Sequence, residues 1–349
     1  MRVDDKLVEE LYGGLAEGTR SRVDCVVEQV CSAKEEGGRI CVVTGSGPNL
    51  HEGVTTLIAE LIRKGIVDGV STSSAVVAHE MAGCLERVYR VDGVEMGMAT
   101  DLLPADGKFE ITLCGDDVIE RLSAEMDVDR ELMQRARDLP GDEIIKAAGN
   151  MSYPVGLRTE RISREICRLA RSRKSTFEEI AGAGSDPRTM IGAGAEMKIP
   201  VLVTVPQLVG GGSVGMDIAD STEMRERSRR IADLLARSDV IIESALALAQ
   251  EVHDGPYETY TGHGIWSGWD GEETYRLLGK RLVRIDLDSN LELAWQKERE
   301  SSRVQEAVAK GLPKTKLMGI PFRMEMSGFA RLPGSLPIVG DIGVIWPII

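Results

Sequence analysis

Short β-branched apolar runs alternate with segments of helical periodicity along most of this chain, and this alternation restricts the fold more than any other feature. The runs predicted as buried strands are residues 39–45, 66–74, 198–206, 238–244 and 280–288. After the first run, apolar residues recur at helical spacing from Val54 to Ile62, as in a helix packed on a sheet. Repeated βα units predict an α/β fold with a mostly parallel, Rossmann-like sheet and helices on both faces.

Other parts of the chain lack the strand pattern. Residues 1–36 are predicted to form two helices, and a further helix is expected from about residue 75 to 90. Strand signals are scarce from about 100 to 197, where charge and periodicity predict a helical insertion or an elaborated crossover. We therefore expect an N-terminal helical segment followed by one α/β domain, residues 37–349, that contains this insertion.

Charge excludes two classes of partner. The 349 residues carry a formal net charge of -14, which repels phosphate backbones and anionic lipid. No apolar run approaches the roughly 20 residues of a membrane span, and the N-terminus lacks a signal peptide's apolar core. The six cysteines show no CxxC pair, so buried free thiols are expected. These features favour a cytoplasmic protein that binds a small molecule.

Glycine and hydroxyl residues follow several of the predicted strands. Because ligands of parallel sheets bind at the carboxyl ends of the strands, these turns form a candidate nucleotide site. The first turn is not the standard dinucleotide fingerprint, since Leu50 occupies the position of the third glycine. The later glycine run at 210–212 is equally well explained as a flexible loop. The residues predicted to bind the nucleotide are Gly45, Ser46, Gly47, Asn49, Thr72, Ser73, Ser74, Gly211, Gly212, Ser213, Asp286, Asp288 and Asn290.

Three residues are candidates for acid–base catalysis. His79 and Glu80 follow the second strand and fall in the early turns of the predicted helix, where the helix dipole favours a neutral, proton-accepting imidazole. His253 is the third candidate. An ordinary hydrogen-bonded histidine explains the pattern about as well.

An aromatic, glycine-broken segment at 253–275 is a candidate substrate-binding loop. Its His263, Trp266 and Trp269 could enclose an aminium group through cation–π contacts. A subunit interface is an equally good explanation of the tryptophans. Arg158 is a candidate for binding a substrate carboxylate, although its densely basic helix is better explained as a solvated face or an electrostatic partner.

Five sequence blocks together resemble a known family. The order of the blocks is similar to the deoxyhypusine-synthase-type NAD-binding fold, and more closely to the LOR/SDH relatives that include archaeal and cyanobacterial ornithine cyclodeaminases. The blocks are residues 44–80, 196–215, 238–252, 281–290 and 337–345.

The resemblance implies an enzyme that oxidises an amino acid or amine to a transient imine and retains its NAD, and it implies a homo-oligomer, either dimer or tetramer. Residues 244–253 contain no lysine, which argues against deoxyhypusine synthesis. Asp286 and Asp288 favour NAD over NADP, because a carboxylate repels a 2′-phosphate.

Two other functions remain open. A nucleotide-binding or regulatory protein without catalysis would need the same turns. A thiamine diphosphate protein would also need an acidic metal motif, which the sequence lacks. No HExxH motif occurs, so no metal site is expected.

Overall fold

The computed structural model describes residues 4–45, 47–83, 88–113, 115–139, 141–144, 155–244, 252–253, 255–260, 273–285, 289–312, 317–320 and 332–349. The chain divides into two compact units. Unit 1 comprises Thr44–Leu234, and unit 2 comprises Arg2–Val43 together with Leu235–Ile349. Unit 2 is therefore discontinuous, because both ends of the chain contribute to it.

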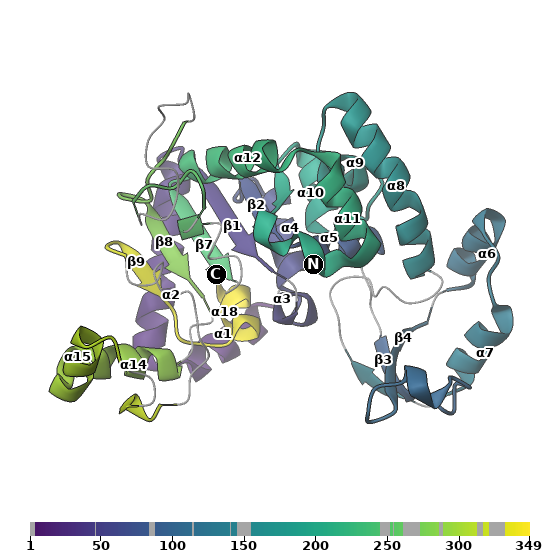
Figure 1. The fold of residues 1–349 in the computed structure, drawn as a ribbon, viewed down its shortest axis with the longest axis horizontal. Helices are drawn as coiled ribbons and strands as arrows, with labels where there is room; N and C mark the ends of the chain where they lie inside the picture. Colours follow the sequence, from purple (N-terminus) through teal and green to yellow (C-terminus); the bar gives the residue numbers. More distant parts are fainter. Residues whose placement is uncertain are drawn as a thin grey trace. The chain divides into compact units, whose positions relative to one another are not determined.

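Six strands form the main sheet in the order β6-β2-β1-β7-β8-β9 (Figure 1). The pairs β2/β6, β7/β8 and β8/β9 are parallel. The strands are β1 (Ile40–Thr44), β2 (Gly69–Thr72), β6 (Val201–Val203), β7 (Val240–Ser244), β8 (Arg281–Arg284) and β9 (Ser335–Pro337). Every residue of β1, β2, β6 and β7 is buried, as in a sheet covered on both faces. The predicted α/β fold is confirmed.

Unit 1 contains the helices that follow β1, β2 and β6. α4 begins after Gly53 and buries Val54, Ile58 and Ile62, the apolar stripe predicted from the sequence. The helices of this part are α3 (Pro48–His51), α4 (Val54–Arg63), α5 (Ser74–Met81), α8 (Val155–Arg173), α9 (Phe177–Gly182), α10 (Met190–Met197), η2 (Val205–Gly211), α11 (Gly212–Ser221) and α12 (Met224–Ala236).

The helix predicted from about 75 to 90 is shorter in the structure. α5 ends at Met81, and Gly83 has a φ of 96°, a conformation that glycine adopts at little cost. Val88, which falls within the predicted helix, begins the strand β3. The prediction was wrong beyond Met81 because the apolar spacing continued the helical period past the glycine that ends the helix.

A second, antiparallel sheet lies within unit 1 between α5 and α8 in the sequence. Its order is β4-β3-β5. Its elements are β3 (Val88–Asp92), η1 (Thr100–Leu102), β4 (Lys108–Thr112), α6 (Asp116–Glu125), α7 (Arg130–Asp138) and β5 (Asp142–Ile144). We call residues 88–144 the small lobe. The segment expected to be a helical insertion thus contains two strands as well as helices. One buried cluster of the small lobe consists of Val91, Met96 and Ile111 with half-buried neighbours.

A buried ion pair closes the free edge of β6, the strand at one end of the main sheet. Glu178 on α9 and Arg227 on α12 form this pair with side chains 0% and 2% exposed. The Val203 N–H donates to Glu178 Oε1 at 2.7 Å, and Arg227 Nη1 donates to the Val203 carbonyl at 3.2 Å. The pair therefore supplies the hydrogen bonds that another strand would provide, and it blocks pairing at this edge.

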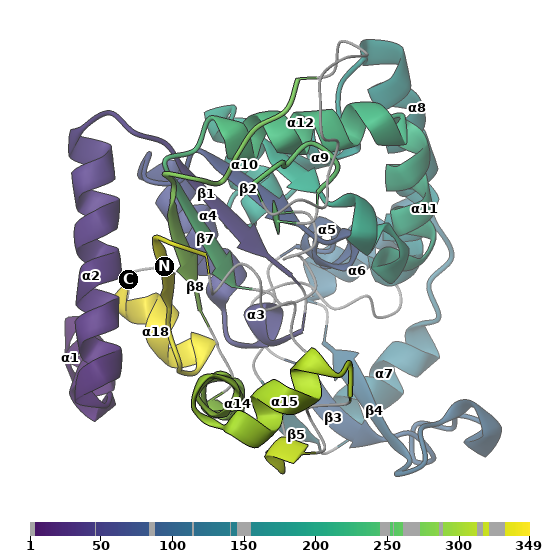
Figure 2. The same ribbon diagram turned by 60° about the vertical axis from the view of Figure 1, so that its left-hand side comes forward.

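Unit 2 joins the N-terminal helices to the C-terminal strands. α2 buries Val23 and Val26, and Thr19 Oγ1 donates to the Val339 carbonyl at 3.2 Å. Figure 2 shows α18 beside α1 and α2. The helices of this unit are α1 (Asp5–Gly14), α2 (Glu17–Glu35), α14 (Ser289–Glu300), α15 (Ser302–Ala309) and α18 (Ile342–Ile348). The two helices predicted in residues 1–36 are confirmed.

Trp346 fastens α18 to the carboxyl end of β7. Its side chain is buried, and its indole Nε1 donates to Ser244 Oγ at 2.8 Å. Replacing Ser244 with alanine leaves a buried indole N–H without this acceptor, so the free energy of unfolding should fall by about 1–3 kcal/mol. Urea denaturation followed by tryptophan fluorescence measures this loss, because all four tryptophans lie beyond residue 265, in unit 2. An unchanged urea midpoint in the Ser244→Ala variant would show that the Trp346–Ser244 hydrogen bond does not stabilise the packing of α18.

Three further features concern the described residues alone. None of their helices is long and apolar enough to cross a bilayer. They contain no group of three or more His, Cys, Asp or Glu side chains suited to a metal ion. The buried free thiols predicted from the sequence are confirmed for Cys41 and Cys167; Cys25 is also a free thiol but half-buried, and Cys31 is free and exposed.

Candidate functional site

Three turns of unit 1 follow strands that are neighbours in the main sheet, β1, β2 and β6. Each turn starts at a threonine whose side chain is fully buried: Thr44, Thr72 and Thr204. Across the described part of the chain, none of these three hydroxyls has a hydrogen-bond partner. Buried polar groups in proteins are nearly always bonded to protein, water or ligand. The three hydroxyls therefore mark places where a polar ligand or water would be bound.

The turns after β2 and β6 pack against each other. The Thr204 N–H donates to the Thr72 carbonyl at 2.8 Å, and Ser74 Oγ donates to the Gln207 carbonyl at 2.7 Å. Ser73 caps the start of α5, since its Oγ accepts from the Val76 N–H at 3.2 Å. The structure thus brings together two of the predicted nucleotide turns, but it uses the hydroxyls of Ser73 and Ser74 to hold the backbone.

The glycines of the turn after β6 have two different roles. A Cβ at Gly211 would lie 2.8 Å from the Ser74 carbonyl oxygen, and one at Gly215 would lie 2.4 Å from the Leu208 carbonyl oxygen. Both glycines are therefore required by packing. Gly212 has a φ of 59° and open space around its Cα, so its backbone is accessible to a ligand. The alternative of a flexible loop does not describe Val205–Gly211, which forms a 3-10 helix.

Two helix starts face open space near these turns. α11 begins at Gly212 with no side chain capping it, and the Ser213 hydroxyl is buried without a partner among the described residues. Uncapped N–H groups at a helix start favour anions. In the first turn, Gly47 has a φ of 67° and open surroundings, and Asn49 is buried. Ser46 lies outside the described residues.

The predicted role of His79 depended on a helix start, and the structure places it elsewhere. α5 is only eight residues long, and His79 lies in its last turn. The positive end of the helix dipole is at the opposite end, so the argument for a neutral imidazole fails. His79 is half-buried, and the error follows from the overlong helix predicted from the sequence.

Glu80 is a fully buried carboxylate that binds another helix start. Its Oε1 accepts from the Met190 N–H at 2.9 Å, and its Oε2 accepts from the Ile191 N–H at 3.0 Å. Burial raises the pKa of this carboxyl to about 7, and the two N–H groups act in the opposite direction. Both oxygens are thus engaged in holding α10 to α5.

The remaining candidates fall in several places. His253 is buried in unit 2, and Asn290 is half-buried near the start of α14. Arg158 donates to Glu125 Oε2 at 2.9 Å, so its guanidinium already has a carboxylate partner. The other predicted residues lie outside the described part of the chain: Asp286, Asp288, His263, Trp266 and Trp269.

Sequence reasoning missed a second buried ion pair, this one in unit 2. Glu243 and Arg284 lie opposite each other at the carboxyl ends of β7 and β8, and their side chains are 0% and 3% exposed. The sequence does contain a signal for this pair. Glu243 falls near the end of the apolar run "VIIES", and Arg284 ends the run "RLVR". Buried charges need a close partner, so opposite charges on two such strands indicate neighbours in the sheet.

Comparison with known proteins gives only distant similarities. No family model matches the sequence, and neither does any of the curated proteins compared with it. The arginine dihydrolase ArgZ of the cyanobacterial ornithine-ammonia cycle has 13% identity and a TM-score of 0.43, over 93% of this chain and 30% of that chain. AgrE in a ternary complex with ornithine and NAD+ has 12% identity and a TM-score of 0.43, over 100% of this chain and 33% of that chain.

A conserved LOR/SDH protein from Methanococcus maripaludis S2 has 10% identity and a TM-score of 0.44, over 95% of this chain and 66% of that chain. This chain therefore spans about a third of the length of ArgZ and AgrE. The values are too low to assign it to a family.

Proposed function

We propose that this protein is an NAD-dependent enzyme that acts on an amino acid or amine, oxidises it transiently to an imine and retains the NAD. The observation that carries the proposal is the group of turns in unit 1. Their buried threonine hydroxyls lack partners among the described residues, and Gly47 and Gly212 leave their backbone accessible. A nucleotide diphosphate requires this combination of hydroxyls and backbone N–H groups.

The residues present fit such a cofactor. The N–H groups of Gly212 and Ser213 at the start of α11 would hold the diphosphate, and the hydroxyls of Thr72 and Thr204 would bind its polar groups. Asp286 and Asp288 stay the predicted ligands of the ribose hydroxyls, and both lie outside the described part of the chain. Bound NAD supplies a hydride acceptor, and the protein must exclude water from the imine. The proposed assembly is a homodimer or homotetramer.

Replacing Ser213 with aspartate tests the diphosphate position. The new carboxylate lies in the first turn of α11, where it is compatible with the helix dipole but repels a bound diphosphate. NAD affinity should therefore fall at least about tenfold, which corresponds to about 1.4 kcal/mol. Isothermal titration with NAD measures the change, and circular dichroism checks that the variant keeps the wild-type fold.

A matched control is the same substitution at Ser302, an exposed first-turn residue of α15 in unit 2. It should leave NAD affinity unchanged. Equal affinity in the Ser213→Asp variant and this control would remove α11 from the site, and an absence of NAD binding by the wild type would contradict the proposal as a whole.

A protein that binds a nucleotide without turnover is the second candidate, and one observation favours it. Both oxygens of Glu80 accept backbone N–H bonds that hold α10 to α5, and His79 lies in the last turn of α5 and not at its start. Mixing the NAD-loaded protein with L-ornithine, L-arginine and simple amines separates the two candidates. The enzyme should show a transient absorbance band of reduced nicotinamide, and a regulatory protein should bind NAD with no such band.

A further inference from the structure

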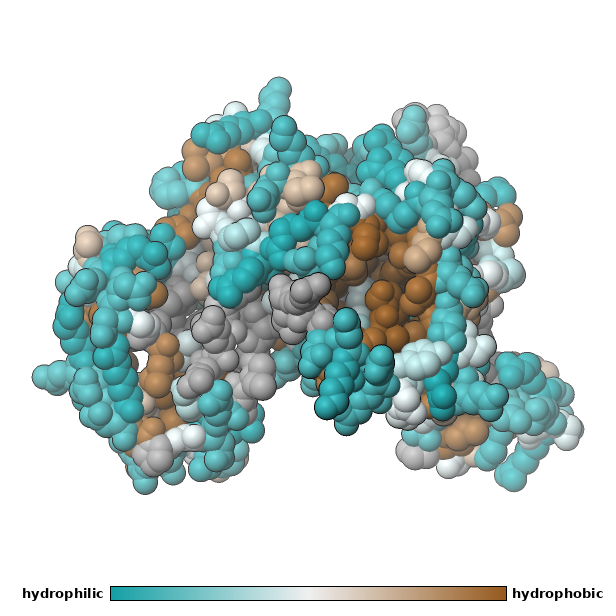
Figure 3. All heavy atoms as spheres, turned by 180° about the vertical axis from the view of Figure 1, so that it is seen from behind, coloured by the Kyte–Doolittle hydropathy of each residue, from teal (hydrophilic) through white to brown (hydrophobic). Residues whose placement is uncertain are grey.

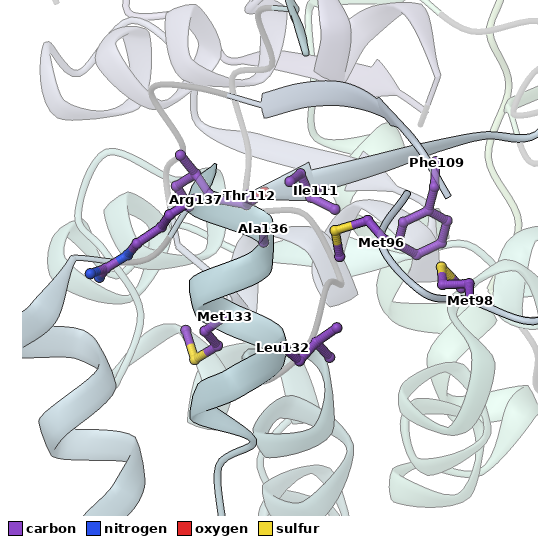
Figure 4. Close-up of a pocket in the computed structure, with 10 residues that line it drawn as sticks. Met96, Met98, Phe109, Ile111, Thr112, Leu132, Met133, Ala136 and Arg137 are labelled. Carbon is purple, nitrogen blue, oxygen red and sulfur yellow. The ribbon is translucent and has the colours of Figure 1, made fainter. Parts of the chain in front are cut away.

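The apolar cavity of the small lobe is a poor site for a phosphate ligand. It has a volume of about 280 Å³ and is lined by apolar side chains such as Met96, Phe109 and Leu132 (Figure 4). Figure 3 shows hydrophobic residues of this lobe inside an opening between hydrophilic surface residues. Arg137 also lines the cavity, but its guanidinium donates to Asp116 at 2.6 Å. Because this cation already has a carboxylate partner, an anion would lose its hydration there without compensation. The turns after β2 and β6 fit a diphosphate better.

Ser74 lies at the centre of these two turns. Its side chain is buried at the first residue of α5, and its Oγ donates to the Gln207 carbonyl at 2.7 Å. Gln207 is the residue at which η2 departs from helical geometry, with a φ of -110° and a ψ of 25°. The Ser74 hydroxyl therefore holds the kink of η2 through its carbonyl group.

The glycines that follow the kink approach Ser74 closely. A Cβ at Gly211 would lie 3.2 Å from the Ser74 Cβ, and a Cβ at Gly215 would lie 3.3 Å from the Ser74 Oγ. Between them, Gly212 begins α11 with a φ of 59° and a ψ of -137°, values that favour glycine. Ser74 thus lies against the chain on both sides of Gly212, so its position determines where the first N–H groups of α11 point.

The two ends of this segment are held independently of Ser74. The Glu178–Arg227 pair binds Val203, the last residue of β6. Arg227 Nη2 also donates to the Ile218 carbonyl near the end of α11 at 3.1 Å. Loss of the Ser74 hydroxyl should therefore leave β6 and α11 folded and change only the turn between them.

We infer that Ser74 is a positioning residue for the diphosphate: its bond to the Gln207 carbonyl holds the first N–H groups of α11 in the geometry that binds this group. Ser74 does not contact the nucleotide in this arrangement, and the inference rests on the NAD site proposed above. A turn that is held in its bound conformation loses little conformational entropy when the ligand binds. Without the hydroxyl, the turn has more freedom to lose, so affinity for the diphosphate should fall.

Ser74→Ala removes the hydroxyl and keeps the Cβ. It should weaken NAD binding about three- to tenfold in isothermal titration, the effect expected from one hydrogen bond. Ser185→Ala is the matched control, because the Ser185 hydroxyl also donates to a backbone carbonyl of unit 1, that of Ala181, at 2.8 Å. Both variants should lose a similar, small amount of stability in urea denaturation, but only Ser74→Ala should lose NAD affinity. Circular dichroism checks the fold of each variant.

The choice of ligand separates positioning from a general loosening of the fold. In competition with NAD, inorganic pyrophosphate should lose affinity for Ser74→Ala by the same factor as NAD does. Adenosine lacks the diphosphate, so its affinity should stay at the wild-type value. A fold that is loosened as a whole would bind all three ligands more weakly.

Two results would overturn the positioning role. They are wild-type NAD affinity in the Ser74→Ala variant, and equal losses of affinity for NAD, pyrophosphate and adenosine. If adenosine does not displace NAD from the wild type, unequal losses for NAD and pyrophosphate overturn the role instead. Failure of the NAD site itself gives a different result, because the wild type would then bind neither NAD nor pyrophosphate.

Discussion

Replacing Arg227 with methionine should lower the free energy of unfolding by about 3–5 kcal/mol, a larger loss than the one expected for Ser244→Ala. Glu178 would remain in a site with no exposed surface and would lose the guanidinium that neutralises it. The Val203 carbonyl at the sheet edge would lose its donor, and so would the Ile218 carbonyl, which Arg227 Nη2 contacts at 3.1 Å. The loss combines an uncompensated charge with two unsatisfied carbonyls.

Hydrogen exchange at the Val203 amide measures the effect at the edge of β6. Its protection should fall by at least about a hundredfold, since about 2.7 kcal/mol is a factor of one hundred in the opening equilibrium. Arg230→Met is the matched control on the same helix, because Arg230 pairs with Glu226 through side chains that are 34% and 45% exposed. Such pairs contribute at most about 1 kcal/mol. Equal protection in the two variants would contradict a stabilising role for the buried pair.

Glu80 should make the stability of the wild type decrease as the pH rises from about 4.5 to about 7. Its pKa in the folded protein is raised from 4.5 to about 7, so its stabilising contribution is complete below the unfolded pKa and is lost as the pH rises through the folded pKa. At 1.36 kcal/mol per pKa unit, this shift corresponds to a change of roughly 3 kcal/mol in the free energy of unfolding.

Glu80→Gln does not titrate, so the wild type should lose about this much stability relative to the variant across that range. Urea denaturation of both proteins at a series of pH values measures the difference. Glu60→Gln serves as a contrast: the hydrogen bond from Arg63 lowers the pKa of Glu60, so its smaller, solvent-screened contribution is lost as the pH falls. A constant difference between wild type and Glu80→Gln would show that Glu80 does not titrate in this range.

Local patterns predicted the main sheet well but not the small lobe. The apolar residues of β1 and β2 and the apolar stripe of α4 are buried in the structure. The spacing of apolar residues in the sequence predicts such burial. β4, "KFEIT", is partly exposed, and its alternating pattern is too short to stand out from its surroundings. The end of α5 was recognisable in principle, because Gly83 marks a helix stop that the apolar spacing obscured.

The sequence predicted which turns follow the strands at the candidate site but not the role of each residue in them. The turns with Thr72 and Gly212 follow strands, as the sequence indicated. The sequence could not separate Gly211, which packing requires, from Gly212, because the difference depends on the Ser74 carbonyl more than 100 positions away. The partners of Glu80 are equally remote in sequence, since Met190 and Ile191 meet it only through tertiary packing. Contacts of this kind leave no local signal.

The discontinuity of unit 2 has a consequence for the order of events at the ribosome. Residues 44–234 emerge as one continuous stretch and can acquire their own packing while synthesis continues. α2 and β1 emerge earlier, yet β7 and β8 are translated about 200 residues after β1. The edge of β1 that pairs with β7 must therefore stay out of aggregates until residues 240–244 are synthesised.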